Sequence, residues 1–402
     1  MTTLAPPLRP RPRYAPVRHL GPHWYATVMG TAIVGTAGTA PAPGLTWIPG
    51  FRAACGAVWA LAFALLLAVG TARALHWIRL RDRALAELRD PAVAPFQGCA
   101  AMALVAVGGG ALTAGRELLG PAAVALGTVL WTAGTALGLL VAVGIPYLMV
   151  ARRLVAGQPG AGTGAGGSAG AGTGGSAGTG AGAGPGPGAS PVWLLPVVAP
   201  MVSAASGPLL AQRLPAGQPR EALLLFCCAL FGLSLLATLL MLPLIFGRLV
   251  SGEPLPLPST PTLFLVLGPL GQSTTAAAAF AGAAPGVPGA RELAVAYGVP
   301  VTGFALMWLA LASAVVVRSL RRGLGFSMTW WAFTFPVGTC VTGTAGLARL
   351  TGLPALGWLA AGLYALLLAA WATAAVRTVR GLAGGGLLAA PREPRPATAR
   401  TR

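Results

Sequence analysis

Charged side chains are scarce in this sequence of 402 residues, and lysine is missing from it altogether. Only 9% of the residues are charged, whereas an average soluble protein carries about 25%. Hydrophobic residues make up 55% of the chain. A folded surface needs polar groups to stay in water, and a single soluble core does not absorb so much apolar sequence. The composition therefore excludes an ordinary soluble domain and predicts that lipid surrounds most of the chain.

Cysteine and histidine are also few. The five cysteines lie in or beside apolar runs without a CxxC pair, and the three histidines are scattered. A buried free cysteine behaves as a small hydrophobic residue. We therefore predict no disulfide framework, no metal site and no cofactor. The cysteines are Cys55, Cys99, Cys227, Cys228 and Cys340, and the histidines are His19, His23 and His76.

The net charge of +19 comes from 27 arginines against eight acidic residues. Such an excess can indicate nucleic-acid binding. Here, however, the arginines lie between apolar runs and line no amphipathic face, which is typical of charges that flank membrane spans. We predict a lipid bilayer, and no nucleic acid, as the partner of this surface.

Apolar runs of membrane-spanning length fill most of the chain. A helix needs about 20 apolar residues to cross a bilayer, where its backbone must satisfy its own polar groups. The runs predict an all-α membrane protein with ten transmembrane helices paired as five hairpins. The predicted spans are residues 23–42, 53–74, 96–115, 121–150, 192–212, 222–247, 262–284, 293–317, 327–348 and 355–377.

The arginines also predict the orientation of these spans. With both termini in the cytoplasm, all but six of the 27 arginines fall on the cytoplasmic side, as the positive-inside rule requires. The domains expected are a cytoplasmic tail at 1–22, a transmembrane domain at 23–377 and a cytoplasmic tail at 378–402. The first 20 residues lack the apolar core of a signal peptide. The six outer arginines are Arg52, Arg116, Arg213, Arg220, Arg291 and Arg349.

One segment within the transmembrane domain is not apolar. Residues 157–190 are nearly all Gly, Ala, Ser and Thr, with proline near the end. Such a composition cannot offset the entropy lost on ordering and predicts a disordered cytoplasmic loop. The segment has neither the lysine nor the strand–helix context of a phosphate-binding loop.

The odd-numbered spans carry more Ser, Thr, Gly and Pro than the even-numbered ones, which predicts an inner ring of odd helices. No carboxylate or histidine lies near the middle of any span, whereas proton-coupled transporters and intramembrane enzymes usually need one there. We therefore predict that the chain is not an enzyme. Free N–H groups at helix breaks would favour anions along such a path, although free carbonyls at the other half would favour cations.

Four motifs lie in order on odd spans: GPHWYATVMGTAIV at 21–34, WLLPVVAPMV at 193–202, LGPLGQ at 267–272 and WWAFTFPVG at 330–338. Together they resemble the tellurite-resistance/dicarboxylate transporter (TDT) family, with Ala32 where the family's first motif usually has glycine. The family includes bacterial tellurite-resistance proteins, malate permeases, fungal sulfite exporters and the slow anion channels of plant guard cells.

The resemblance implies a plasma-membrane homotrimer in which each subunit passes small inorganic or organic anions through its own central pore. In channels of the family a phenylalanine on the ninth helix plugs the pore, and by its place in the motif this residue is Phe335. A hydrophobic side chain can gate a pore by occlusion and dewetting. The alternatives are that an aromatic residue beside proline merely packs, or that Phe333, on another face of the helix, forms the constriction.

The other pore-lining candidates are small or polar residues on the odd spans. The glycines are expected to thin the helix backbone rather than contact an anion. Gln272 and Thr334 either hydrogen-bond an anion or satisfy backbone groups freed by the neighbouring prolines. These candidates are Gly30, Thr31, Gly35, Pro200, Gly268, Pro269, Gly271, Gln272, Thr334 and Gly338.

Two functions remain open at this point. The first is a channel or uniporter-like pore gated by phenylalanine, which the lack of carboxylates in the middle of the membrane favours. The second is a proton-coupled secondary transporter that exports sulfite or tellurite or moves a C4-dicarboxylate.

Overall fold

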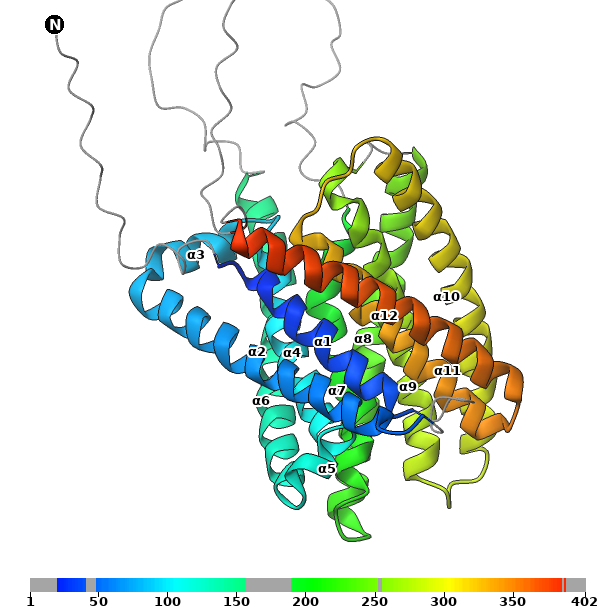
Figure 1. Ribbon diagram of the computed structural model, residues 1–402. Helices are drawn as coiled ribbons and strands as arrows, with labels where there is room; N and C mark the ends of the chain where they lie inside the picture. Colours follow the sequence, from blue (N-terminus) through cyan, green and yellow to red (C-terminus); the bar gives the residue numbers. More distant parts are fainter. Residues whose placement is uncertain (1–19, 41–47, 157–188, 252–254, 385–386, 388–402) are drawn as a thin grey trace, which may run out of the picture.

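The fold is built from helices alone among the residues that the structure describes (Figure 1). The structure is a computed structural model and describes residues 20–40, 48–156, 189–251, 255–384 and 387. Most of the predicted N-terminal tail, the Gly-rich loop and most of the C-terminal tail lie outside the described residues.

Five long helices are apolar on all sides yet bury only a narrow stripe of their surface. We call them the outer helices. They are α2 (Phe51–Arg79), α6 (Ala122–Ala156), α8 (Gln218–Ser251), α10 (Ala290–Arg321) and α12 (Pro354–Ala383). Between 22% and 33% of the residues in their most apolar windows are buried. A helix that is hydrophobic all round but exposed in the folded chain is expected to face lipid.

Five shorter helices are buried on nearly every face. We call them the inner helices. They are α1 (Tyr25–Gly38), α4 (Gly98–Leu112), α7 (Leu194–Ala211), α9 (Leu267–Ala283) and α11 (Phe335–Thr351). Each inner helix packs against the outer helix that follows it in the chain. Two further short helices, α3 (Arg81–Arg89) and α5 (Arg116–Leu119), lie in the connections.

A short 3-10 segment precedes each inner helix. Proline stands at the start of four of these segments, where its fixed φ and missing N–H suit a first helical turn. The segments extend the inner helices toward membrane-spanning length. They are η2 (Pro22–Trp24), η3 (Ala94–Gln97), η4 (Pro191–Trp193), η5 (Leu257–Val266) and η6 (Met328–Phe333).

Eight helical segments are long and apolar enough to cross a membrane: the five outer helices and the segments that contain α4, α7 and α9. With 14 and 17 residues, α1 and α11 are shorter than a usual span, so the count of ten spans stays a prediction. Every outer helix continues past its predicted end, α12 for example to Ala383 instead of 377. Arginine is a good helix former whose stem can lie along apolar surface, so the helices run on through the arginine-bearing turns.

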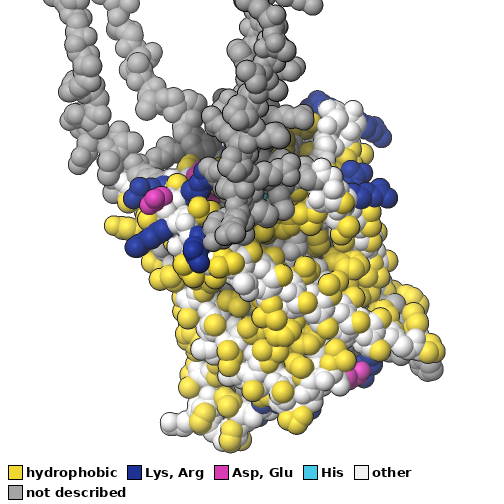
Figure 2. Space-filling view, turned by 60° about the vertical axis from the view of Figure 1, so that its left-hand side comes forward, with side chains coloured by type: hydrophobic (Ala, Val, Ile, Leu, Met, Phe, Trp, Pro, Cys, Tyr) yellow, Lys and Arg dark blue, Asp and Glu magenta, His cyan; other side chains and the backbone are white. Residues whose placement is uncertain are grey.

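The charges lie at the two ends of the helix bundle. Figure 2 shows a broad hydrophobic surface between one end with most of the visible arginines and an opposite end with few charged groups. At the arginine-rich end, Arg73 is buried and donates to both carboxylate oxygens of Glu87 on α3, the closer at 2.8 Å, and to the carbonyl of Leu20. Arg73 of α2 thereby links α3, through the ion pair with Glu87, and the start of the described chain, through the hydrogen bond to Leu20.

Candidate functional site: a cavity between the five inner helices

All five inner helices contribute side chains to one small cavity of about 80 Å³. By comparison, a single water needs about 10–15 Å³ of such space. Among the described residues, no charged side chain or histidine lines the cavity. The lining residues are Ile33 and Thr36 of α1, Val105, Ala106, Gly109 and Gly110 of α4, Val202, Ala205, Ser206 and Leu209 of α7, Gln272 and Thr275 of α9, and Phe335 and Thr342 of α11.

Four hydroxyl groups reach this cavity, and each lies within hydrogen-bond distance of a carbonyl of its own helix. Thr36 donates to the carbonyl of Ala32 at 3.0 Å, and Ser206 donates to that of Val202 at 2.9 Å. Across the α9–α11 contact, the hydroxyl oxygens of Thr275 and Thr342 lie 2.8 Å apart. Because a hydroxyl rotates freely about its C–O bond, these groups can redirect a proton toward an ion that enters.

Gln272 is the only side-chain amide among the described residues that line the cavity. The residue is 6% exposed, and its amide oxygen has no hydrogen-bond partner among the described residues. Buried polar atoms of proteins are nearly always hydrogen-bonded, so this amide oxygen is an exception among the described residues. In this structure the side chain does not satisfy the backbone near Pro269, which was one of the two predicted roles.

Phe335 stands at a break in the chain at the edge of the same cavity. The preceding residue, Thr334, has φ −94° and ψ −75° and separates η6 from α11, which begins at Phe335. The Thr334 hydroxyl donates to the carbonyl of Trp331 at 2.7 Å, and this carbonyl also accepts the backbone N–H of Thr334 at 3.1 Å. The Phe335 side chain is 2% exposed and lines the cavity.

Phe333, the rival candidate, packs elsewhere. Its ring centroid lies 4.8 Å from that of Phe264 and 5.7 Å from that of Trp330, both in edge-on geometry. It does not line the central cavity. Of the two phenylalanines, only Phe335 is placed where a side chain could close the space between the inner helices.

Most of the predicted glycines lie at helix contacts rather than at the cavity. A Cβ atom at Gly271 would lie 2.5 Å from the backbone of Thr339 and Cys340 on α11. Gly30 faces Thr334, and Gly338 faces Ile33, so both allow close approach of α1 to the η6–α11 segment. Gly35 faces the backbone of Cys55 on α2.

Three other candidates differ from these contact glycines. Gly268 is buried, yet a Cβ built there would meet no atom within 4 Å, so open space lies beside it. Pro200 and Pro269 are buried but do not line the cavity.

Thr31 points away from the cavity. Its hydroxyl donates to the carbonyl of Thr27 at 2.7 Å and accepts the indole N–H of Trp371, on α12, at 3.1 Å. Among the predicted site residues, only Gln272 and Phe335 line the cavity. Thr36, Ser206, Thr275 and Thr342 were not predicted, although Gln272 and Thr275 share a helical face at a spacing of three residues.

The chain matches the family described as voltage-dependent anion channel (SLAC1) over residues 19–379. It is 22% identical over 363 residues to an uncharacterised transporter of Methanocaldococcus jannaschii, covering 90% of this chain and 93% of that protein.

The chain also resembles sulfite efflux pumps over part of its length. It is 32% identical over 170 residues to such a pump from Trichophyton rubrum, covering 39% of this chain and 44% of the pump. A sulfite efflux pump of Arthroderma otae matches to the same extent. The match to the anion-channel family covers both sides of the Gly-rich loop and includes every element that lines the central cavity. The chain therefore belongs to the SLAC1/TDT family of anion channels and transporters, as its four motifs predicted.

Proposed function

We propose that the chain passes small anions across the cell membrane through the cavity between the inner helices, and that Phe335 gates this path. In this proposal the ten helices form five membrane-spanning hairpins, with the inner helices as a pore ring. The observation that carries the proposal is that residues from all five inner helices meet at one uncharged cavity which the Phe335 side chain borders.

The chemistry of the lining favours a weakly held anion. A buried carboxylate would repel an anion, and an arginine would hold it too tightly for rapid passage, whereas amide and hydroxyl donors lie between these limits. The Gln272 side chain lines the cavity, and its amide carries two N–H groups that can donate to an anion there. The N-terminus of α11 at Phe335 adds a partial positive charge beside the cavity.

The size of the cavity favours a small ion. About 80 Å³ has room for a few waters or one small inorganic anion, and the Phe335 ring must move for the path to open. We therefore prefer a small inorganic anion over a C4-dicarboxylate. We further propose that both termini lie in the cytoplasm of a plasma-membrane protein, because the distribution of the arginines favours this orientation. The family resemblance favours a homotrimer with one pore in each subunit.

An exporter of sulfite is the second candidate. The 32% identity to sulfite efflux pumps favours it. In such a protein, transport of sulfite would be coupled to a proton gradient, whereas a channel would carry current down the anion's own gradient.

Anion flux into proteoliposomes tests the proposal. The full chain, Phe335→Ala and Phe333→Ala would be compared under a chloride gradient at an imposed voltage. We expect a large electrogenic increase for Phe335→Ala only, because only this change removes a side chain from the central cavity. Equal fluxes for both variants would contradict the gate. Proton-driven sulfite uptake without chloride current would favour the exporter.

A further inference from the structure

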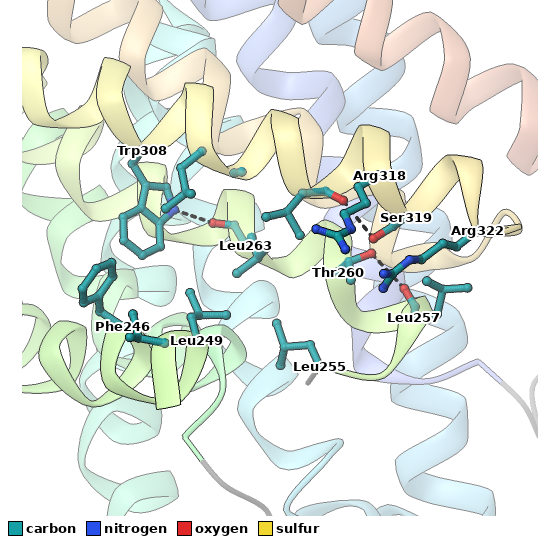
Figure 3. Close-up of a pocket in the computed structure, with 14 residues that line it drawn as sticks. Phe246, Leu249, Leu255, Leu257, Thr260, Leu263, Trp308, Arg318, Ser319 and Arg322 are labelled. Carbon is teal, nitrogen blue, oxygen red and sulfur yellow. Dashed lines mark hydrogen bonds between the residues drawn. The ribbon is translucent and has the colours of Figure 1, made fainter. Parts of the chain in front are cut away.

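A larger cavity of about 420 Å³ lies on the outside of the helix bundle, between α8 and α10 (Figure 3). Its floor is the segment from Leu255 to Leu263, and it is separate from the central cavity in all its lining residues. The apolar lining residues are Phe246, Leu249, Val250, Leu255, Leu257, Leu263, Trp308, Leu311, Ala312 and Val315.

The apolar end of this groove is held in a fixed shape. The indole N–H of Trp308 donates to the carbonyl of Leu263 at 2.9 Å, which ties α10 to the floor. The ring of Phe246 lies 6.3 Å from that of Trp308 and closes this end (Figure 3). Because the surrounding surfaces of α8 and α10 are exposed and apolar, the groove opens toward the region that hydrocarbon chains fill.

The other end of the groove is cationic. Arg318 lies in the last turn of α10, and Arg322 directly follows the end of this helix. Both are exposed, and Figure 3 shows their guanidinium groups beside the hydroxyls of Thr260 and Ser319. Within the described part of the chain, neither arginine forms an ion pair with a carboxylate. Glu253 is near in sequence but lies outside the described residues.

We propose that this groove binds an anionic phospholipid, with the phosphate between Arg318 and Arg322 and one acyl chain along the apolar floor. A lipid of this class has an anionic phosphate for the cationic end of the groove and a hydrocarbon chain for its apolar end. The two arginines lie at the C-terminal end of the long apolar helix α10, where headgroups are expected to meet water. A second copy of the chain fits less well, because the sequence has only eight acidic residues to place opposite the arginines.

Native mass spectrometry of the purified full-length protein in detergent tests this site. Dioleoyl phosphatidylglycerol is titrated against dioleoyl phosphatidylcholine, and the bound lipids are counted for each subunit. We expect Arg318→Gln/Arg322→Gln to weaken phosphatidylglycerol binding by roughly thirty-fold, since each arginine near a lipid headgroup contributes about a factor of five. Val315→Trp should fill the groove and weaken binding of both lipids.

The matched control is Arg321→Gln/Arg380→Gln, which removes the same charge from the same end of the bundle but from residues that do not line the groove. The control should bind phosphatidylglycerol like the wild type, and an equal loss in both double variants would overturn the proposal. Displacement of the lipid by glycerol 3-phosphate would overturn it in favour of a soluble anion.

Two further results would also contradict the lipid site. Loss of oligomers in Arg318→Gln/Arg322→Gln, with unchanged lipid affinity, would identify the groove as a contact between copies. Glu253→Gln should leave phosphatidylglycerol binding unchanged. A strong increase in phosphatidylglycerol affinity would show that the Glu253 carboxylate pairs with the two arginines in place of a lipid.

Discussion

The inner and outer helices are both apolar, but close helix contacts at glycine are more frequent on the inner helices, and many glycines of the outer helices have no neighbour. On the inner helices, a Cβ at Gly271 would touch the backbone of α11, and one at Gly98 would touch the backbone of α7. On the outer helices, several glycines would meet nothing within 4 Å: Gly70, Gly144, Gly232, Gly247, Gly303 and Gly362. Glycine therefore sets the distance between helices in the inner layer, whereas at these outer positions no packing constraint requires it.

The two layers also differ in how they use tryptophan. Four outer helices send an indole N–H inward to an inner helix or its 3-10 segment. The acceptors are Val107 for Trp59 of α2, Ser203 for Trp131 of α6, Leu263 for Trp308 of α10, and the hydroxyl of Thr31 for Trp371 of α12. In a membrane, where lipid gives no hydrophobic drive to helix association, such bonds and close packing hold the layers together. The outer layer thus supports the inner one, and the central cavity depends on both.

The largest effect is expected from placing a charge in the cavity. Gln272→Glu in the Phe335→Ala background should lower chloride flux roughly a hundred-fold or more, because a buried carboxylate a few ångströms from an anion repels it by several kcal/mol. Gln272→Leu removes only the donors and should lower the flux about ten-fold. Flux in proteoliposomes measures both, and unchanged flux in the two variants would show that the anion does not pass Gln272.

The helices of this fold could be predicted from the sequence, but the faces that meet at the cavity could not. Hydropathy locates an apolar helix because crossing a bilayer requires a long apolar run, so all ten predicted spans overlap helices that differ from them mainly at their ends. The first span, α1, ends earlier, at Gly38. Residues 41–47 lie outside the described part of the chain.

The register around each inner helix has no comparable signal. These helices are buried on all sides, so no polar face marks the side that meets the cavity. Thr31 and Thr36 illustrate the problem, because both carry a hydroxyl group on α1. Thr31 lies within the first motif (21–34), and Thr36 lies two residues beyond it. Thr31 faces Trp371 of α12, whereas Thr36 faces the cavity. Only tertiary contacts distinguish them, and Phe335 was placed through its family resemblance.

A smaller effect, on stability, is expected where the inner helices touch. Gly271→Ala should destabilise the protein by about 1–3 kcal/mol, since its methyl group would overlap the α11 backbone. Gly303→Ala is the matched change on an exposed face of α10 and should be neutral or stabilise by up to about 1 kcal/mol, because alanine favours helix. Melting temperatures in detergent compare the two variants. Equal shifts in melting temperature would show that glycine matters no more at the inner helix contact than on the exposed face of α10.

The smallest effect is expected for a single bond between the layers. Trp371→Phe keeps an aromatic ring at a half-buried position of α12 but removes the N–H that reaches the hydroxyl of Thr31 at 3.1 Å. Hydrogen bonds between membrane helices contribute about 0.6 kcal/mol on average, and a half-buried site loses little packing, so the melting temperature should fall only slightly. Trp358→Phe is the control, because Trp358 is exposed on α12 and should not change the melting temperature. A fall as large as that of Gly271→Ala would mean that the indole bonds, and not the close contacts of the inner helices, carry most of the stability of the bundle.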